Sequence, residues 1–165
     1  MRNYNLILRM ALSAALASLT GQAAAVTTTS SFSVTATVLT TCSVSSTDLG
    51  FGNYDALAAQ ALDTTSTVSV QCTLSTGYSV GLNAGIGSGA TVTTRKMTST
   101  DSATLDYSLY QDNGRSVVWG ESGAAAVTGT GTGAQVDHTV YGRIPTGQYV
   151  SPDTYSDTIT VTVTF

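Results

Sequence analysis

Two stretches near the ends of this chain alternate strictly between apolar and polar side chains. In Ser31–Thr40 (SFSVTATVLT) the apolar face consists of Phe32, Val34, Ala36 and Val38. Asp157–Phe165 (DTITVTVTF) repeats the pattern, with Ile159, Val161, Val163 and Phe165 on one face. A period of two in β-branched and small residues predicts strands that each bury one face.

Shorter runs between these two stretches predict further strands. They cover residues 65–73, 78–82, 91–94, 105–111 and 136–144, with a weak strand inside 120–133. Asn113-Gly114 predicts a hairpin from 105–111 back to 116–119, and Trp119 is expected in the core. Residues 56–62 suggest a short helical turn. Seven or eight short strands joined by turns indicate an all-β sandwich.

The last predicted strand poses a packing problem. An immunoglobulin-like sandwich needs one more edge strand beside it, and no residues follow Phe165 in this sequence. The face of the last strand would then border a long apolar groove, which is an aggregation hazard unless another segment covers it. We therefore expect the first alternating stretch to pair with a neighbouring molecule.

Composition and charge support this class and remove others. Only 10% of the residues are charged, and the net charge is −4. Without the first 25 residues the chain would carry four Lys and Arg against ten Asp and Glu, a net charge of −6. No basic patch is present, so nucleic acid and anionic membrane are poor partners.

The first 25 residues read as a secretory signal peptide. Arg2 gives a positive start, an apolar run extends from Leu6 to Leu19, and Ala23-Ala24-Ala25 is a small-residue cleavage site. The alternative, a membrane anchor, needs a longer apolar run. We expect export and a mature chain that begins near Val26.

Cys42 and Cys72 are the only cysteines. In an exported chain an even number suggests a disulfide, here across a loop of about 30 residues. A metal pair or a redox pair is the alternative, and neither has clustered ligands in the sequence.

We find no catalytic, metal or cofactor motif. Gly85–Ala90 superficially matches the dinucleotide fingerprint, but strand-like residues follow it where a helix is required. His138 is the sole histidine and is expected on a strand surface, and Asp153 and Asp157 are expected to be solvated turn residues. A nucleophile with its base and orienting group is missing, so we expect no enzyme and no small-molecule substrate.

Several motifs together resemble one family. They are Leu49–Asp55 (LGFGNYD), Val70–Thr73 (VQCT), Tyr107–Tyr110 (YSLY), Trp119-Gly120, Val140–Pro145 (VYGRIP) and Tyr155–Phe165. This set resembles the spore coat protein U domain, the subunit family of archaic (Csu-type) chaperone–usher pili. Asp153 departs from the pattern, since the family more often has Gly there.

The resemblance implies an incomplete immunoglobulin-like sandwich that lacks its seventh strand. A periplasmic chaperone would lend a strand and deliver the subunit to an outer-membrane usher, where the next subunit's N-terminal extension would replace it. Residues 26–40 would be this donor extension, with Phe32, Val34, Ala36 and Val38 facing the groove. Residues 41–165 would be the domain, with Ile159, Val161, Val163 and Phe165 on its acceptor strand and the terminal carboxylate as a chaperone contact.

The resemblance thus favours a structural subunit of an extracellular pilus that supports adhesion and biofilm formation. Its copies, or related pilins, would join head to tail. A tip adhesin and a spore or cell-surface coat protein remain the alternatives, and a small secreted enzyme is the least favoured.

Overall fold

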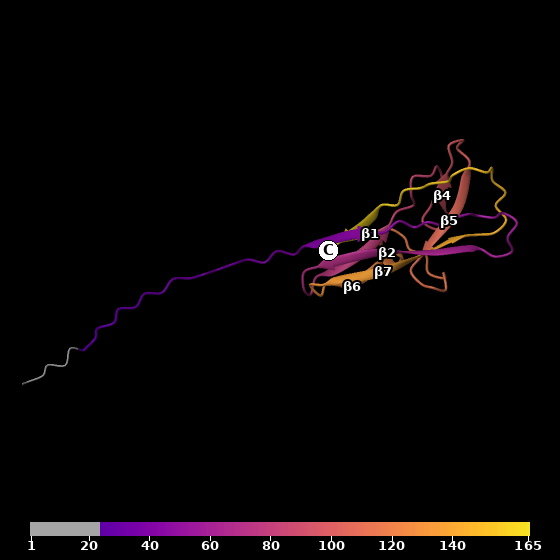
Figure 1. The fold of residues 1–165 in the computed structure, drawn as a ribbon. Coiled ribbons are helices and arrows are strands. Elements are labelled where there is room, and N and C mark those ends of the chain that lie inside the picture. The colour runs from indigo at the N-terminus through magenta and orange to yellow at the C-terminus, as the bar shows by residue number, and fades with distance from the viewer. Residues whose placement is uncertain (1–23) are drawn as a thin grey trace, which may run out of the picture. The chain divides into compact units, whose positions relative to one another are not determined.

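The structure, a computed structural model, describes residues 24–165, and its eight strands form two antiparallel sheets. The strands are β1 (Cys42–Ser46), β2 (Leu62–Cys72), β3 (Gly77–Leu82), β4 (Arg95–Thr98), β5 (Thr104–Tyr110), β6 (Val127–Thr130), β7 (Gln135–Ile144) and β8 (Val161–Thr164). One sheet has the order β1-β2-β7-β5-β4 and the other β6-β3-β8 (Figure 1). A single 3₁₀ turn, η1 (Gly123–Ala125), precedes β6. The predicted all-β, immunoglobulin-like class is confirmed.

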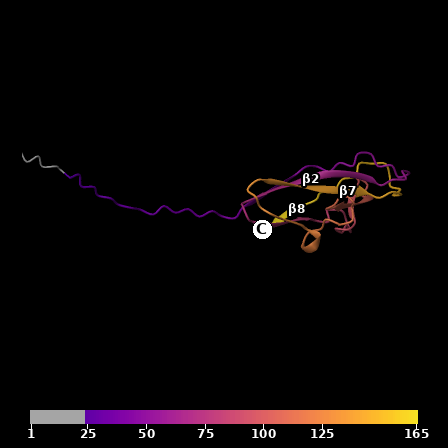
Figure 2. The same cartoon turned by 90° about the horizontal axis from the view of Figure 1, so that it is seen from below.

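The two sheets enclose one hydrophobic core. Viewed from below, β8 lies in the layer opposite β2 and β7 (Figure 2). The long strands follow the period-two pattern, with alternate residues buried along β2 and β5. Trp119 is fully buried between the layers, and its indole N–H donates to the carbonyl oxygen of Val80 at 2.8 Å. The predicted core position of Trp119 is confirmed.

Arg95 is the one fully buried cation among the described residues. Its guanidinium donates to the carbonyl oxygens of Asn83, Val92, Leu82 and Trp119 at 2.7–3.1 Å. Burial lowers the pKa of this group. Because four backbone carbonyls share one side chain, Arg95 ties the loop after β3 to the Trp119 segment, and a point-charge lysine has no matching fork of donors.

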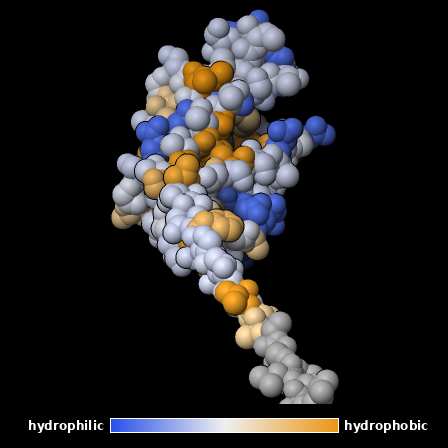
Figure 3. Space-filling view, turned by 90° about the vertical axis from the view of Figure 1, so that its left-hand side faces the viewer, coloured by the Kyte–Doolittle hydropathy of each residue, from blue (hydrophilic) through white to orange (hydrophobic). Residues whose placement is uncertain are grey.

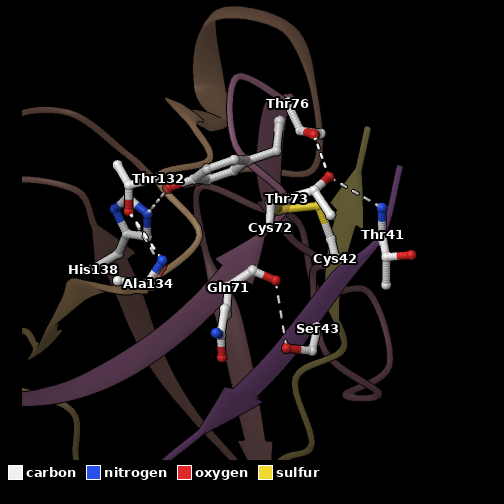
Figure 4. The surroundings of a disulfide bond; sticks show 11 residues. Thr41, Cys42, Ser43, Gln71, Cys72, Thr73, Thr76, Thr132, Ala134 and His138 are labelled. Carbon is white, nitrogen blue, oxygen red and sulfur yellow. Dashed lines mark hydrogen bonds between the residues drawn. A yellow bond between two sulfur atoms is a disulfide. The ribbon is translucent and has the colours of Figure 1, made fainter. Parts of the chain in front are cut away.

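A disulfide holds the first strand at one end of the sandwich. Cys42 and Cys72 are bonded, and they are also paired partners in the β1–β2 ladder. The Thr73 amide donates to the Thr41 carbonyl at 3.0 Å, and the Thr73 hydroxyl bonds Thr76 at 2.7 Å (Figure 4). The disulfide prediction is confirmed.

Two local predictions are wrong. Residues 56–62 form no helical turn, because the Asp55 carboxylate and carbonyl accept the Leu57 and Ala58 amides in a compact turn. Residues 91–94 are not a strand, since Thr91 and Thr94 bond each other's backbone in a turn, and β4 begins only at Arg95. The glycine run ahead of it is a loop, as predicted.

The Asn-Gly hairpin forms only in part. The chain does turn back at 113–114, and the Gln111 amide donates to the Val117 carbonyl at 2.9 Å. Its second arm makes a single bridge, Tyr110 to Val118, and not a strand.

The first alternating stretch carries no strand in this single chain. Residues 24–41 contain no helix or strand, and Phe32, Val34 and Val38 are 83–87% exposed. A strand needs partners for its N–H and C=O groups, so alternation alone does not produce one. Residues 1–23 of the predicted signal peptide lie outside the described residues. Within residues 24–165, no helix is long and apolar enough to cross a membrane.

His138 faces inward, which corrects its predicted surface position. It lies on β7 with its ring edge-on to Tyr78 and Trp119, at centroid distances of 5.9 and 6.5 Å. Its Nε2 is 3.0 Å from the Tyr78 hydroxyl. Burial lowers the pKa of His138, and the neighbouring Asp137 opposes this shift in part. The period-two pattern of β7 already assigned residue 138 to the inner face.

Replacing both cysteines by serine should lower the free energy of unfolding by about 3–4 kcal/mol, because the bond closes a 30-residue loop. Urea denaturation of the oxidised chain and the Cys42→Ser/Cys72→Ser variant measures the difference. Added reductant should weaken the unmodified chain alone. Equal midpoints for the two proteins would contradict the structural role of this bond.

Protonation of His138 should destabilise the fold. Its pKa is lower in the folded than in the unfolded state, where it is about 6.5. Stability is therefore full above pH 6.5 and falls as the pH drops below it. Urea midpoints at pH 7.5, 6.5 and 5.5 should decline, and His138→Gln, which keeps a polar group without titration, should flatten the decline. Parallel slopes would show that His138 is not responsible.

Candidate functional site: an open groove beside the last strand

One edge of β8 has no partner among residues 24–165. On its other edge β8 pairs antiparallel with β3, from Val161 opposite Leu82 to Thr164 opposite Ser79. β8 is thus an edge strand of the three-stranded sheet, as β1 is of the five-stranded sheet. An edge of this kind presents a row of unpaired N–H and C=O groups.

A groove opens into the core next to this edge. It has a volume of about 410 Å³ and runs between the segment after β1 and the segment before β8. Its apolar lining consists of Leu49, Phe51, Leu82, Met97, Tyr107, Leu109, Val140 and Ile159. On the face drawn in Figure 3, apolar surface likewise lies in a depression bordered by polar residues. Core side chains therefore reach solvent where a further strand would cover them.

The groove is roomier at one end. β1 and β8 approach within 8 Å between α-carbons, near the disulfide and the C-terminus. The C-terminus lies at the end of the sandwich where β1 begins, in both ribbon views (Figures 1 and 2). The 410 Å³ volume lies toward the opposite end, between residues 46–51 and 155–159.

The predicted acceptor residues line this edge with the predicted alternation. Ile159, Val161 and Val163 are half-buried and pack against the core, whereas Phe165 is 58% exposed. The assigned strand β8 is shorter than the predicted Thr158–Phe165, and the backbone bond from the Asn83 amide to the Thr160 carbonyl extends its pairing by one residue.

Asp157 holds the start of this segment, which corrects its predicted role as a solvated turn residue. Its carboxylate accepts from the Tyr107 hydroxyl at 2.7 Å and from the Ile86 amide at 2.8 Å. Burial, followed by the bond to Asp157, raises the pKa of Tyr107 far above its usual range. Gly85, at φ +85°, lies against the same carboxylate, where a β-carbon would overlap it. Such a partnership across 50 residues leaves no local pattern in the sequence.

Asp153 is separately engaged. Its carboxylate accepts from the Thr100 amide and hydroxyl at 3.2 and 2.8 Å, and these bonds lower its pKa. Within residues 24–165, no three His, Cys, Asp or Glu side chains gather into a site that could hold a metal ion.

The motif at residues 49–55 forms a lid on the far end of the core. Phe51 packs edge-to-face on Tyr107 at 6.0 Å, and Phe51 and Leu49 come so close to Gly142 that a β-carbon there would meet them at 2.9–3.1 Å. Tyr54 donates to the Pro145 carbonyl at 3.0 Å and accepts from the Gln148 amide at 2.9 Å. The corner and the 140–145 motif are therefore packing partners at one end of the groove.

The groove and the alternating segment belong to separately described parts of the chain. Val38–Phe165 forms one compact unit, which contains the whole groove. Phe32, Val34 and Ala36 lie in the preceding part and are exposed. The predicted donor role of these residues stays a prediction.

Comparisons with known proteins point to one family. The model of the Spore Coat Protein U domain matches residues 28–162. "Protein U" of Myxococcus xanthus is 36% identical over 157 residues, which cover 87% of this chain and 88% of that protein.

A solved structure is similar in fold as well. It is a chain of the CsuC–CsuE chaperone–tip adhesion subunit pre-assembly complex from archaic chaperone-usher Csu pili of Acinetobacter baumannii, with a TM-score of 0.58 and 25% identity. The match covers 78% of this chain and 41% of that one, so this chain spans about two fifths of the longer chain.

The match of the family model over most of the described sandwich and the 36% identity to Protein U lead to the same assignment: this chain belongs to the Spore Coat Protein U domain family.

Proposed function

We propose that this protein is a structural subunit of a bacterial surface pilus, assembled by the chaperone–usher route. The observation that carries the proposal is the open groove beside β8, which exposes core residues along an unpaired strand edge. The similarity to a chain from a chaperone–subunit complex of Csu pili supports the same class of assembly.

The occupant of the groove is the N-terminal extension of another copy or of a related pilin. Its alternating side chains have the period that a strand beside β8 requires, and they are exposed in the single chain. Main-chain bonds give an added strand its affinity, and pockets for alternate side chains give it specificity. Burial of Phe32, Val34 and Val38 would contribute about 5–8 kcal/mol.

The remaining assignments follow from this proposal. Residues 1–25 direct export to the periplasm, residues 26–40 are the donor extension, and residues 41–165 are the acceptor domain. A periplasmic chaperone covers the groove with its own strand and contacts the terminal carboxylate until an outer-membrane usher exchanges it. The filament lies on the cell surface, supports adhesion and biofilm formation, and performs no enzymatic reaction.

A surface coat assembled by the same pairing is the second candidate. The 36% identity to Protein U and the family description favour it. Electron microscopy of the producing cell separates the two, because a pilus forms filaments away from the envelope and a coat forms a layer on it.

Polymerisation by strand pairing should give a ladder of multimers in surface-sheared material on an unboiled SDS gel, collapsing to one band on boiling. Val34→Asp should abolish the ladder, because it places a charge on the buried face. Thr35→Asp is the matched control, with the same charge on the solvent face, and should keep the ladder. A single monomer band before and after boiling, for the unmodified chain, would refute the polymer.

A further inference from the structure

The backbone of the acceptor edge defines how a donor strand must lie on it. The Asn83 amide donates to the Thr160 carbonyl at 3.2 Å, and the Thr160 amide donates to the Asn83 side chain at 2.9 Å. Thr160 therefore directs its backbone groups toward β3. The Leu82 amide bonds Gly120 on the far side of β3, at 3.0 Å, so the opposite pair, Leu82 and Val161, is not hydrogen-bonded.

Alternation along the strand then assigns every other residue. The even residues 160, 162 and 164 point their backbone groups to β3 and their exposed side chains to solvent. Ile159, Val161, Val163 and Phe165 point their N–H and C=O groups to the open edge. The same residues carry the apolar face, so an added strand must pair its own inward-facing residues with them.

The ends of the sandwich select the direction of the donor. Cys42, where the body of the chain begins, and the C-terminus of β8 lie at the same end. A donor parallel to β8 would bring the body of its subunit to that end, where the acceptor's own extension also leaves. An antiparallel donor places its body at the opposite end, which allows a non-closing head-to-tail chain.

Three antiparallel registers keep apolar faces together, and the groove discriminates among them. With Val38 opposite Val161, Thr40 would face the roomy apolar end and Phe32 would pass beyond Phe165. With Val38 opposite Asp157, only Ala36 would face that end. The first arrangement buries a hydroxyl and the second leaves a void.

We infer that the donor of one subunit pairs antiparallel with β8 of the next, in the register that sets Val38 opposite Ile159. The inference rests on the proposed donor-strand function and specifies its geometry. The four inward pairs are Val38 with Ile159, Ala36 with Val161, Val34 with Val163, and Phe32 with Phe165. Val38 fills the roomy end, and the small Ala36 and Val34 lie where β1 and β8 approach most closely.

The outward-facing threonines provide a direct test. In this register Thr37 lies opposite Thr160, as a non-hydrogen-bonded pair with both side chains in solvent. Cysteines at such positions are close enough to bond, whereas a shift of two residues exceeds the reach of a disulfide. Thr37→Cys is combined in the full chain with Cys at Thr158, Thr160, Thr162 or Thr164, in turn.

The readout is a boiled, non-reducing gel of surface-sheared, thiol-quenched polymer. Thr37→Cys/Thr160→Cys should give a covalent ladder at least about ten times stronger than the other three pairs, and Thr37→Cys alone should give none. A ladder from the Thr158 or Thr162 pair would overturn the register. A covalent product from the Thr164 pair, as a ladder or a bridged monomer, would overturn the direction.

The same samples run unboiled keep the register distinct from the function. If the non-covalent ladder forms and no pair is cross-linked, the register is wrong and the proposed function stands. If no unboiled ladder forms in the unmodified chain, the proposed function fails, and the register fails with it.

Discussion

The whole structure depends on one strand edge that the described chain leaves unpaired. In a two-layer sandwich, the last strand both covers the core with its side chains and saturates the backbone of its neighbour. Here the edge of β8 does neither on its outer side, so Leu109 and Tyr107 border a groove instead of a closed core. Such an edge is a liability for an isolated molecule and a specific binding surface for an assembling one.

The body is built to hold that edge in place while it is empty. Asp157 fixes the start of the acceptor segment to Tyr107 and the loop after β3, and Arg95 ties that loop to the core. At the other end the disulfide pins β1 beside β2. A groove whose two ends are fixed loses little conformational freedom when a strand enters, which leaves more of the contact free energy for binding.

The sequence revealed the elements with regular period-two patterns, because burial of one sheet face leaves that pattern directly in the residues. It did not reveal that Thr91–Thr94 is a turn, since backbone bonds between these two ends overrode the strand preference of threonine and valine. Nor did it reveal Asp157, whose partners Tyr107 and Ile86 lie 50 and 71 residues away. The cysteines were recognisable from number and compartment, whereas His138 was misplaced by its polarity although its register was correct.

Regular alternation by itself leaves an ambiguity that the groove must resolve. Donor and acceptor both repeat an inward apolar and an outward hydroxyl residue, so a slip of two positions preserves every apolar contact in kind. What differs along the donor is size, from Phe32 through Ala36 to Val38, and what differs along the groove is width. Matching size to width supplies a single register, and the shared end of Cys42 and Phe165 supplies a single direction. An unpaired edge that would otherwise accept many strands thereby becomes selective for one.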